Sequence, residues 1–454
     1  MKTKNLAAAA LPVLSALAFA LAAGPAAAQA SLEGWALMPA NTFSPGPTSG
    51  QFANGAGGNP LPLVGLQPVQ GFSGVLQGPV AGSYRFMTDN GFGTQANSAD
   101  ALLRVYALTP DFRTATGGSG TVRANDYLSG AALPGFSAQS NISLSDPNHK
   151  LGFTIQADYT HYYNNAANPL VDSSIRANRL LTGADLDVES MRKDKNGNMW
   201  FGDEFGPFLV KTDATGKVLR SEISLTGVKS PQNPYLGGGS PTLNSSNGFE
   251  GMAMNAAGDR LFTLLEGSVA GDPAKSLRIN SFNVDTESYT DQQWFYKLDA
   301  DGTNIGDMTA INDHEFLVLE RNGGTGTSGT PFKKVFRIDL NETDANGYVG
   351  KHEVADLMNI ADPNDLNRDG SSTFTFPFVT IENVLVLDAN TILVVNDNNY
   401  PGTGGRDLGS DNTEFLKIHL DQALNVSAVP ESGTLGMMLM GGLGLLAVSR
   451  RRRG

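Results

Sequence analysis

Residues 189–204 have the sequence ESMRKDKNGNMWFGDE, in which two short runs flank the turn Asp194-Lys-Asn-Gly197. An Asn-Gly turn between such runs is typical of a β-hairpin. The hairpin begins on Glu189 and ends on Glu204. Since the first residue of one antiparallel strand lies beside the last residue of the next, we expect both carboxylates at the same end of the hairpin.

Four more segments repeat this pattern of two runs around a turn. They begin and end at Ser73 and Asp89, Glu250 and Glu266, Asp307 and Glu320, and Glu382 and Asp397. A third strand is expected after each hairpin, at residues 103–109, 208–213, 277–284, 334–340 and 415–420. Small sheets that recur about every 50 residues are typical of a β-propeller, because radial repetition leaves only short protected edges.

We therefore predict an all-β protein whose main domain, residues 71–424, is a β-propeller of six blades. Five hairpins are visible, and residues 113–185 or 341–380 are the candidates for the sixth blade. A β-sandwich is the alternative fold, but sandwich strands do not require carboxylates at both ends of a hairpin.

The repeated carboxylates predict a metal site. In equivalent blades they converge on one rim of one channel, where like charges raise one another's pKa unless protons or cations neutralise them. Oxygen donors without His or Cys favour Ca²⁺ or another hard divalent cation. For any single acid the alternative role is to cap a turn or to pair with a basic neighbour. The proposed ligands or water-activating bases are Glu189, Glu204, Glu250, Glu266, Glu320, Glu382 and Asp397, with Asp187 and Asp203 as supporting acids.

Hydrolysis of an ester by metal-activated water is the chemistry most compatible with such a ring. Glu189, Glu204 and Arg321 are the candidate catalytic residues. Lys211, Arg321 and Arg406 adjoin the hairpin ends and are the candidates for holding an anionic ester, although ordinary surface charge also explains them. The chain has no G-x-S-x-G motif, and its five histidines fall outside the repeated positions, which argues against a serine nucleophile.

Two further signals leave alternatives open. Residues 365–370 read DLNRDG, the opening half of a calcium loop, but Phe376 stands where the loop needs Glu, so a plain Asp/Asn turn is equally compatible. Four tyrosines in loop-like contexts could stack on sugars or simply pack in the protein: Tyr162, Tyr163, Tyr235 and Tyr400.

The composition excludes several classes of protein. The formal net charge of −13 argues against a nucleic-acid binder, because phosphate backbones require clustered cations. The absence of Cys excludes disulfides, thiolate metal sites and a Cys nucleophile.

Both ends have the pattern of targeting segments. Residues 1–30 combine Lys2 and Lys4, an apolar run and an Ala-Gln-Ala site, as in a secretory signal peptide cut before Ser31. Residues 429–453 resemble the PEP-CTERM sorting signal, with Val429-Pro-Glu431, a short apolar helix and four terminal arginines. That resemblance implies an exosortase, transient inner-membrane anchoring and delivery to the surface or exopolysaccharide matrix of a Gram-negative bacterium. Residues 31–70, rich in Gly and Pro, are predicted to be an irregular arm.

Several longer motifs resemble the bacterial phytase-like family, described as having esterase-like activity of phytase. They include residues 179–190 (RLLTGADLDVES), 200–209 (WFGDEFGPFL), 248–252 (GFEGM), 317–322 (LVLERN) and 376–384 (FPFVTIENV). The resemblance runs from about Gly71 to Leu420 and implies a propeller and a hydrolase of a phosphoric or carboxylic ester. Ser73 departs from the acidic pattern of the hairpins, which puts a ligand from that blade in doubt.

The sequence thus predicts an exported, surface-sorted hydrolase of a small-molecule ester, most favourably a phosphate ester, that binds calcium-like ions and acts as a monomer. Its other partners would be signal peptidase, exosortase and an exopolysaccharide. The alternative is a non-enzymatic, calcium-stabilised propeller that serves as a surface or matrix binding module.

Overall fold

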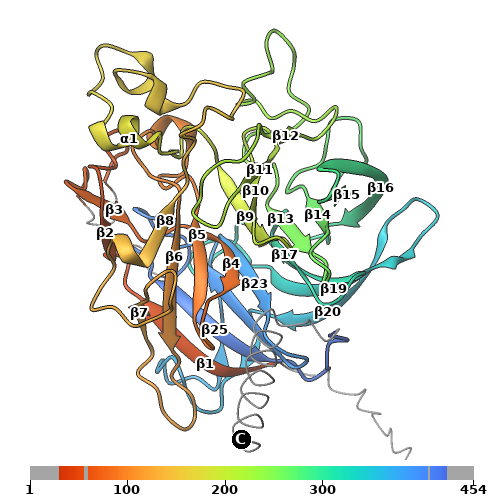
Figure 1. Ribbon diagram of the computed structural model, residues 1–454. Coiled ribbons are helices and arrows are strands. Elements are labelled where there is room, and N and C mark those ends of the chain that lie inside the picture. The colour runs from red at the N-terminus through yellow and green to blue at the C-terminus, as the bar shows by residue number, and fades with distance from the viewer. Residues whose placement is uncertain (1–29, 56–59, 407–408, 427–454) are drawn as a thin grey trace, which may run out of the picture.

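The structure is a computed structural model and describes residues 30–55, 60–406 and 409–426. Nearly all of its regular structure is β-strand (Figure 1). The predicted signal peptide, Ala30 apart, and the predicted sorting signal with Val429, Pro430 and Glu431 lie outside the described residues. Within the described part of the chain, no helix is both long and apolar enough to cross a membrane.

The strands form five four-stranded antiparallel blades in the described residues. Three are separate sheets, and two are joined into a larger sheet by one parallel pair, Leu37 with Thr121. Blade I contains β4 (Phe72–Gln77), β5 (Tyr84–Thr88), β6 (Arg104–Asp111) and β7 (Thr121–Ala124). Blade II contains β9 (Val188–Lys193), β10 (Met199–Asp203), β11 (Phe208–Thr212) and β12 (Ile223–Ser224).

The remaining three blades follow in chain order. Blade III contains β13 (Gly251–Met254), β14 (Arg260–Leu264), β15 (Ser276–Asn283) and β16 (Ser288–Lys297). Blade IV contains β17 (Asn304–Ala310), β18 (Glu315–Arg321), β19 (Lys333–Thr343) and β20 (Val349–Asp356). Blade V contains β23 (Ile381–Val386), β24 (Thr391–Asn396), β25 (Thr413–His419) and, from the other end of the chain, β1 (Ser31–Met38).

The first strands of the blades form a closed inner ring. β4 contacts β9, β9 contacts β13, β13 contacts β17, β17 contacts β23, and β23 returns to β4. Figure 1 shows these strands near the middle of the molecule, with β1, β7, β16 and β20 toward its periphery. A closed ring of radially arranged sheets is a β-propeller, as the hairpin repeats predict.

The prediction of a sixth blade is wrong for the described residues, because both candidate stretches serve other purposes. Residues 113–185 supply β7, the short β8 (Asn141–Ser143) and a peripheral segment with α1 (Ser173–Asn178). Three 3-10 helices also lie in this stretch, at Ala138–Ser140, Gln156–Asp158 and Tyr162–Asn164. A fourth, at Gln95–Asn97, lies in the loop between β5 and β6. Residues 341–380 supply β20 and the short β21 (Ile360–Ala361) and β22 (Thr373–Phe374).

The prediction of an irregular arm over residues 31–70 is wrong at its beginning, because β1 closes the ring. β1 runs antiparallel to β25 from Ser31 opposite His419 to Met38 opposite Thr413. The adjacent Trp35 and Ala36 are both buried although they point to opposite faces, whereas Glu33 is exposed, so the strand departs from the simple alternation of a half-buried strand. The arm also contains β2 (Phe43–Pro45) and β3 (Leu66–Pro68), which pair with each other.

Apolar side chains packed between neighbouring blades form the core. Met87 and Val105 of blade I share one cluster with Met191 and Phe201 of blade II. Equivalent clusters fill the other spaces between blades, so the inner ends of the five blades are held in fixed relative positions. That rigidity allows side chains from distant parts of the sequence to meet at the centre.

Ring closure by β1 makes Trp35 a test of the fold. Trp35 packs in the cluster between blades IV and V, and its Nε1 donates to Glu414 at 3.0 Å. We expect Trp35→Ala to lower the free energy of unfolding by about 3–5 kcal/mol, the range for truncating a packed aromatic side chain. Urea denaturation would measure this change. Glu33→Ala, at an exposed position of the same strand, should change stability by less than about 0.5 kcal/mol; similar effects of both variants would contradict closure by β1.

Candidate metal centre

A β-bulge recurs at the start of four of the five inner strands, where it sets one residue outside the ladder. In blades I, II, IV and V the ladder between the first two strands skips one residue: Ser73, Glu189, Gly306 and Glu382. In blade III, Glu250 directly precedes β13 and takes the corresponding place. A bulged residue leaves the ladder and its side chain is re-aimed, which brings three carboxylates to the inner ring.

A second set of side chains comes from the ends of the second strands. Asp89, Glu204 and Asp397 each directly follow the last paired residue of β5, β10 and β24. Glu266 follows β14, and its amide donates to Gly248 at 2.9 Å as the Glu204 amide does to Asp187 at 2.8 Å. In blade IV the corresponding residue is Arg321, because Glu320 is the residue paired with Ile305.

The prediction that Asp307 and Glu320 join the acidic ring is therefore corrected by one residue. The bulge in blade IV falls on Gly306, and a shift of one residue sends a strand side chain to the opposite face. Asp307 instead pairs with Arg192 at 2.9 Å and accepts the Val384 amide at 3.0 Å. Glu320 lies between blades, where it accepts the Asp299 amide at 2.7 Å and pairs with Lys351.

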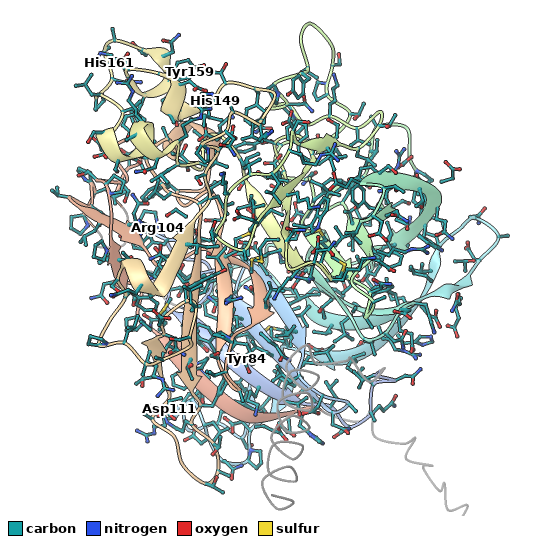
Figure 2. All side chains as sticks on the ribbon, viewed as in Figure 1. Tyr84, Arg104, Asp111, His149, Tyr159 and His161 are labelled. Atoms are coloured by element: carbon teal, nitrogen blue, oxygen red, sulfur yellow. The ribbon has the colours of Figure 1, made fainter. Side chains whose placement is uncertain are left out.

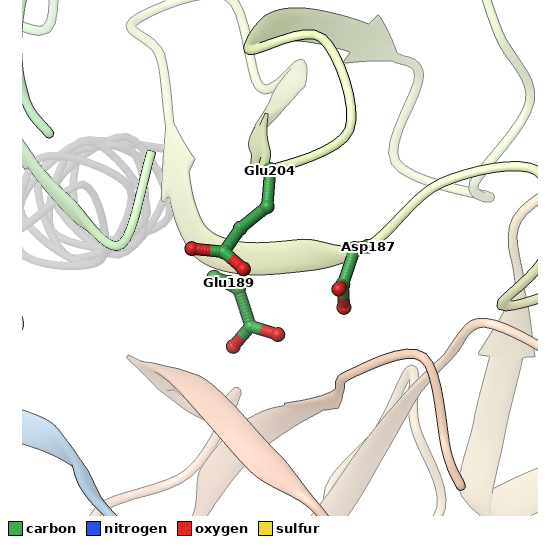
Figure 3. A group of neighbouring side chains, drawn as sticks. All are labelled: Asp187, Glu189 and Glu204. Atoms are coloured by element: carbon green, nitrogen blue, oxygen red, sulfur yellow. The ribbon is translucent and has the colours of Figure 1, made fainter. Parts of the chain in front are cut away.

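We call eight convergent carboxylates the acid cluster: Asp89, Asp187, Glu189, Glu204, Glu250, Glu266, Glu382 and Asp397. All except the partly buried Asp89 are at most 8% exposed. Within it, ligand atoms of two groups of three lie within 4.8 Å of one another. The first acid group is Asp187, Glu189 and Glu204 (Figure 3), and the second acid group is Glu189, Glu250 and Glu382. Such spacing suits a hard cation, and the buried carboxylates are compatible with a divalent one.

Neighbouring donors fix the orientation of most cluster carboxylates. Glu204 accepts the Gly248 amide at 3.0 Å, and Asp397 accepts the Asn399 amide at 2.9 Å. Ser73, which breaks the acidic pattern, donates its hydroxyl to Glu382 at 2.9 Å. Blade I therefore contributes an orienting hydroxyl at this position.

Asp203 and Asp187, the two predicted supporting acids, lie together, but Asp187 itself falls among the possible cation ligands. Asp203 accepts the backbone amides of Asp187 at 2.8 Å and Gly206 at 2.7 Å, which fixes the chain that carries Asp187. The Oδ1 atom of Asp187 is buried and has no hydrogen-bond partner. Figure 3 shows the carboxylates of Asp187, Glu189 and Glu204 as neighbours. An unsatisfied buried carboxylate oxygen beside two more acids fits a cation ligand.

Arg321 is the one predicted cation that the structure brings to the acid cluster. Its Nη2 atom lies 3.1 Å from Glu266 Oε1, 3.1 Å from Glu382 Oε1 and 3.4 Å from Glu250 Oε1. The residue is only 8% exposed. Arg321 thus neutralises carboxylates of blades III and V.

Lys333 is a second buried cation here that sequence reasoning missed. It lies opposite Arg321 in the ladder of β18 and β19, is fully buried, and donates Nζ to the backbone oxygens of Asn322 and Val379. Burial, with a smaller effect of Arg321, lowers the pKa of Lys333 to about 7. Its pairing with Arg321 across the ladder could have identified it, but that pairing is known only from the strand register.

The structure does not bring Lys211 or Arg406 to the acid cluster. Lys211 pairs with Glu287 at 2.6 Å and lies over the ring of Trp200. Arg406 pairs with Glu414 and contacts the rings of Phe374 and Phe378. Both cations are therefore engaged elsewhere among the described residues.

Burial and mutual repulsion raise the pKa values of the cluster. Burial, followed by the charge of Asp397, raises the pKa of Glu382 to about 8, and burial raises that of Asp397 to about 6. The pKa values of Glu189, Glu204 and Glu250 are also well above the usual range, first from burial and then from neighbouring carboxylates. A bound cation would reverse this effect by favouring the ionised forms.

The remaining sequence signals lie away from the cluster. Figure 2 shows His149 and His161 in the peripheral segment near α1. In the segment that begins at Asp365, Asp369 accepts the amide of Ser371, two residues on, at 2.8 Å, as in an Asp/Asn turn. Tyr162 and Tyr400 are buried, whereas Tyr235 is exposed and Tyr163 donates its hydroxyl to the Gln95 carbonyl.

Comparison with known proteins gives one family. The family model for phytase-like proteins, described as esterase-like activity of phytase, matches residues 67–400, well over half of the chain. No curated protein matches the chain.

The similar solved structures include a luciferin-regenerating enzyme, with 10% identity, a TM-score of 0.36, and coverage of 80% of this chain and 96% of that one. Another is the calcium-binding protein regucalcin from Agrobacterium tumefaciens str. C58, with 12% identity, a TM-score of 0.35, and coverage of 86% and 99%. A third is a GH43 endo-arabinanase from Bacillus licheniformis, with 10% identity, a TM-score of 0.35, and coverage of 76% and 94%. These scores are too low to carry an argument about function.

The raised pKa values predict how pH changes the stability of the metal-free protein. The folded protein keeps protons on these acids at pH values where the unfolded chain, with ordinary carboxyl pKa values near 4.5, has released them. The free energy of unfolding should therefore fall as pH rises from about 5 through 8, the range given by Asp397 and Glu382. Chemical denaturation in chelator at several pH values would measure this. The slope should be smaller in Glu382→Gln, and a flat or rising profile would contradict the expected protonation.

Proposed function

The chain belongs to the phytase-like family, and from that premise we propose that it is an exported hydrolase of an ester, most favourably a phosphate ester, that works with a divalent cation. The observation that carries the proposal is the first acid group, in which three buried carboxylates converge without a basic partner among the described residues. Such an arrangement is costly unless a cation or protons neutralise it.

Asp187, Glu189 and Glu204 would hold the cation, and Ca²⁺ suits a set made only of hard oxygen donors. When bound, the cation would polarise an ester oxygen and make a water molecule more acidic. Glu189 and Glu204, whose carboxylates would lie beside that water, are the candidates for taking its proton. Asp203 would hold Asp187 in place through its backbone amide.

Export by signal peptidase and sorting by an exosortase to the envelope surface or exopolysaccharide matrix remain part of the proposal. One structural observation supports the first step. The predicted cleavage before Ser31 coincides with the start of β1, so removal of the leader would leave the whole closing strand in the mature protein.

A second candidate function is a calcium-stabilised binding module without catalysis. The observation that favours it is the state of the two cations beside the cluster: Arg321 is engaged with three carboxylates, and Lys333 is fully buried. A hydrolase of an anionic ester needs a cation that can reach its substrate.

The two functions differ in a direct assay. The purified protein would be tested on a phosphomonoester, a phosphodiester and a short acyl ester, with Ca²⁺, with Mn²⁺ and with chelator. For the hydrolase, we expect turnover of one substrate that requires the cation and falls by at least about 100-fold in Glu189→Gln, because removing a group that binds the cation or transfers the proton raises the barrier. Glu353→Gln, at an exposed site on β20, is the matched control and should keep full activity.

The thermal midpoint separates loss of chemistry from loss of fold. Ca²⁺ at about 100 times its Kd should stabilise the wild-type protein by about 2.7 kcal/mol. If Ca²⁺ raises the midpoint but no substrate is hydrolysed, the binding module replaces the hydrolase. If neither Ca²⁺ nor Mn²⁺ changes the midpoint or any rate, the metal centre itself is wrong.

A further inference from the structure

In the part of the chain that the structure describes, the first acid group has no positive charge beside it, whereas Glu250, Glu266 and Glu382 share Arg321. The inference drawn from this difference rests on the proposed divalent cation. We propose that the cluster binds one divalent cation per chain, in the first acid group, and that the Arg321 guanidinium permanently takes the place of a second cation beside Glu250, Glu266 and Glu382.

The first acid group has no basic side chain to neutralise it among the described residues. Among the described residues, none of Asp187, Glu189 and Glu204 forms an ion pair. Asp187 adds an oxygen that is buried and unpartnered, although its backbone is fixed by Asp203. Three carboxylates and one unsatisfied oxygen in a buried site call for a positive charge that no side chain supplies there.

Glu250, Glu266 and Glu382 already have a positive charge among them, that of Arg321. A single nitrogen, Arg321 Nη2, contacts carboxylate oxygens of Glu250, Glu266 and Glu382 at 3.1 to 3.4 Å. This nitrogen carries only two hydrogens for three acceptors, so it lies among them as an ion would. A Ca²⁺ ion bound about 2.3–2.6 Å from Glu250 and Glu382 would occupy the same space, which makes the guanidinium and a second cation mutually exclusive.

Glu189 belongs to both acid groups but is not among the three carboxylates that pair with Arg321, so it remains available to the first acid group. The source of the asymmetry is blade IV, which has Gly306 at its bulge and Arg321 at the end of its second strand. A side chain at Gly306 has no room, because its Cβ would lie 1.9 Å from the Ile381 oxygen. Blade IV therefore supplies no carboxylate and one fixed cation.

The test is a count of bound cations in the metal-free full chain, with Ca²⁺ and Mn²⁺ titrated by calorimetry. Wild-type protein should bind one cation per chain. Arg321→Gln removes the guanidinium and should bind two, because Glu250 and Glu382 are then free to act with Glu189. Arg337→Gln is the matched control: Arg337 is an ion-paired arginine of the same blade, bound to Glu315 at the opposite end of β18, and its loss should leave the count at one.

Two further variants keep the proposal testable if Arg321→Gln does not fold. Asp187→Asn should weaken the wild-type site by at least roughly 10- to 100-fold. Glu266→Gln, which touches Arg321 but belongs to neither acid group, should still bind one cation. Equal losses in these two variants would overturn the inference.

The outcomes also distinguish this inference from the proposed function. Two cations in wild-type protein, or one in folded Arg321→Gln, overturn the role of Arg321 and leave a metal-dependent function intact. No bound cation in wild-type protein overturns both.

Discussion

Repulsion between carboxylates at the centre of the ring is the constraint on which the rest of this structure depends. Folding brings together acids that are as far apart in the chain as Asp89 and Asp397 and removes most of them from water. Raised pKa values are the direct consequence, since burial and like charge both disfavour ionisation. The packing between blades must therefore hold the inner strands together against this repulsion, and Arg321 offsets part of it with a single buried guanidinium.

Closure of the ring is what makes the cluster continuous. The strand β1 completes blade V, so Glu382 and Asp397 are carried by a blade that contains the first and the last strand of the described residues. Across the junction with blade I, Ser73 donates to Glu382 and Phe72 O accepts from Asn383. The site thus depends on a strand far from it in sequence, because an open ring would let blade V move away from blade I.

The hairpin repeats were enough to predict the propeller, and matched acids at hairpin ends predicted most of the cluster. In blade IV the matched pattern points to Glu320, one residue before Arg321, because the sequence does not reveal the bulge at Gly306 that sets the register of the ladder. β1 departs from the alternation of a half-buried strand, since the adjacent Trp35 and Ala36 are both buried. Lys211 and Arg406 follow the hairpin ends in sequence, but their partners Glu287 and Glu414 come from other strands and loops, which sequence proximity cannot indicate.

Arg321 neutralises only some of the carboxylates in the cluster, and this affects how the site can fold without a bound cation. A ring with acids in all five blades would depend entirely on protons or ions for its stability at neutral pH. Arg321 is part of the chain and cannot be removed by chelation, so carboxylates of blades III and V are neutralised in the metal-free protein as well. The first acid group is then the part of the cluster that a bound cation neutralises, and that cation can be exchanged. If the cluster binds one cation, as proposed, Arg321 holds blades III and V together whether or not that cation is bound. Reversible binding requires this, because the site must stay folded after the cation dissociates.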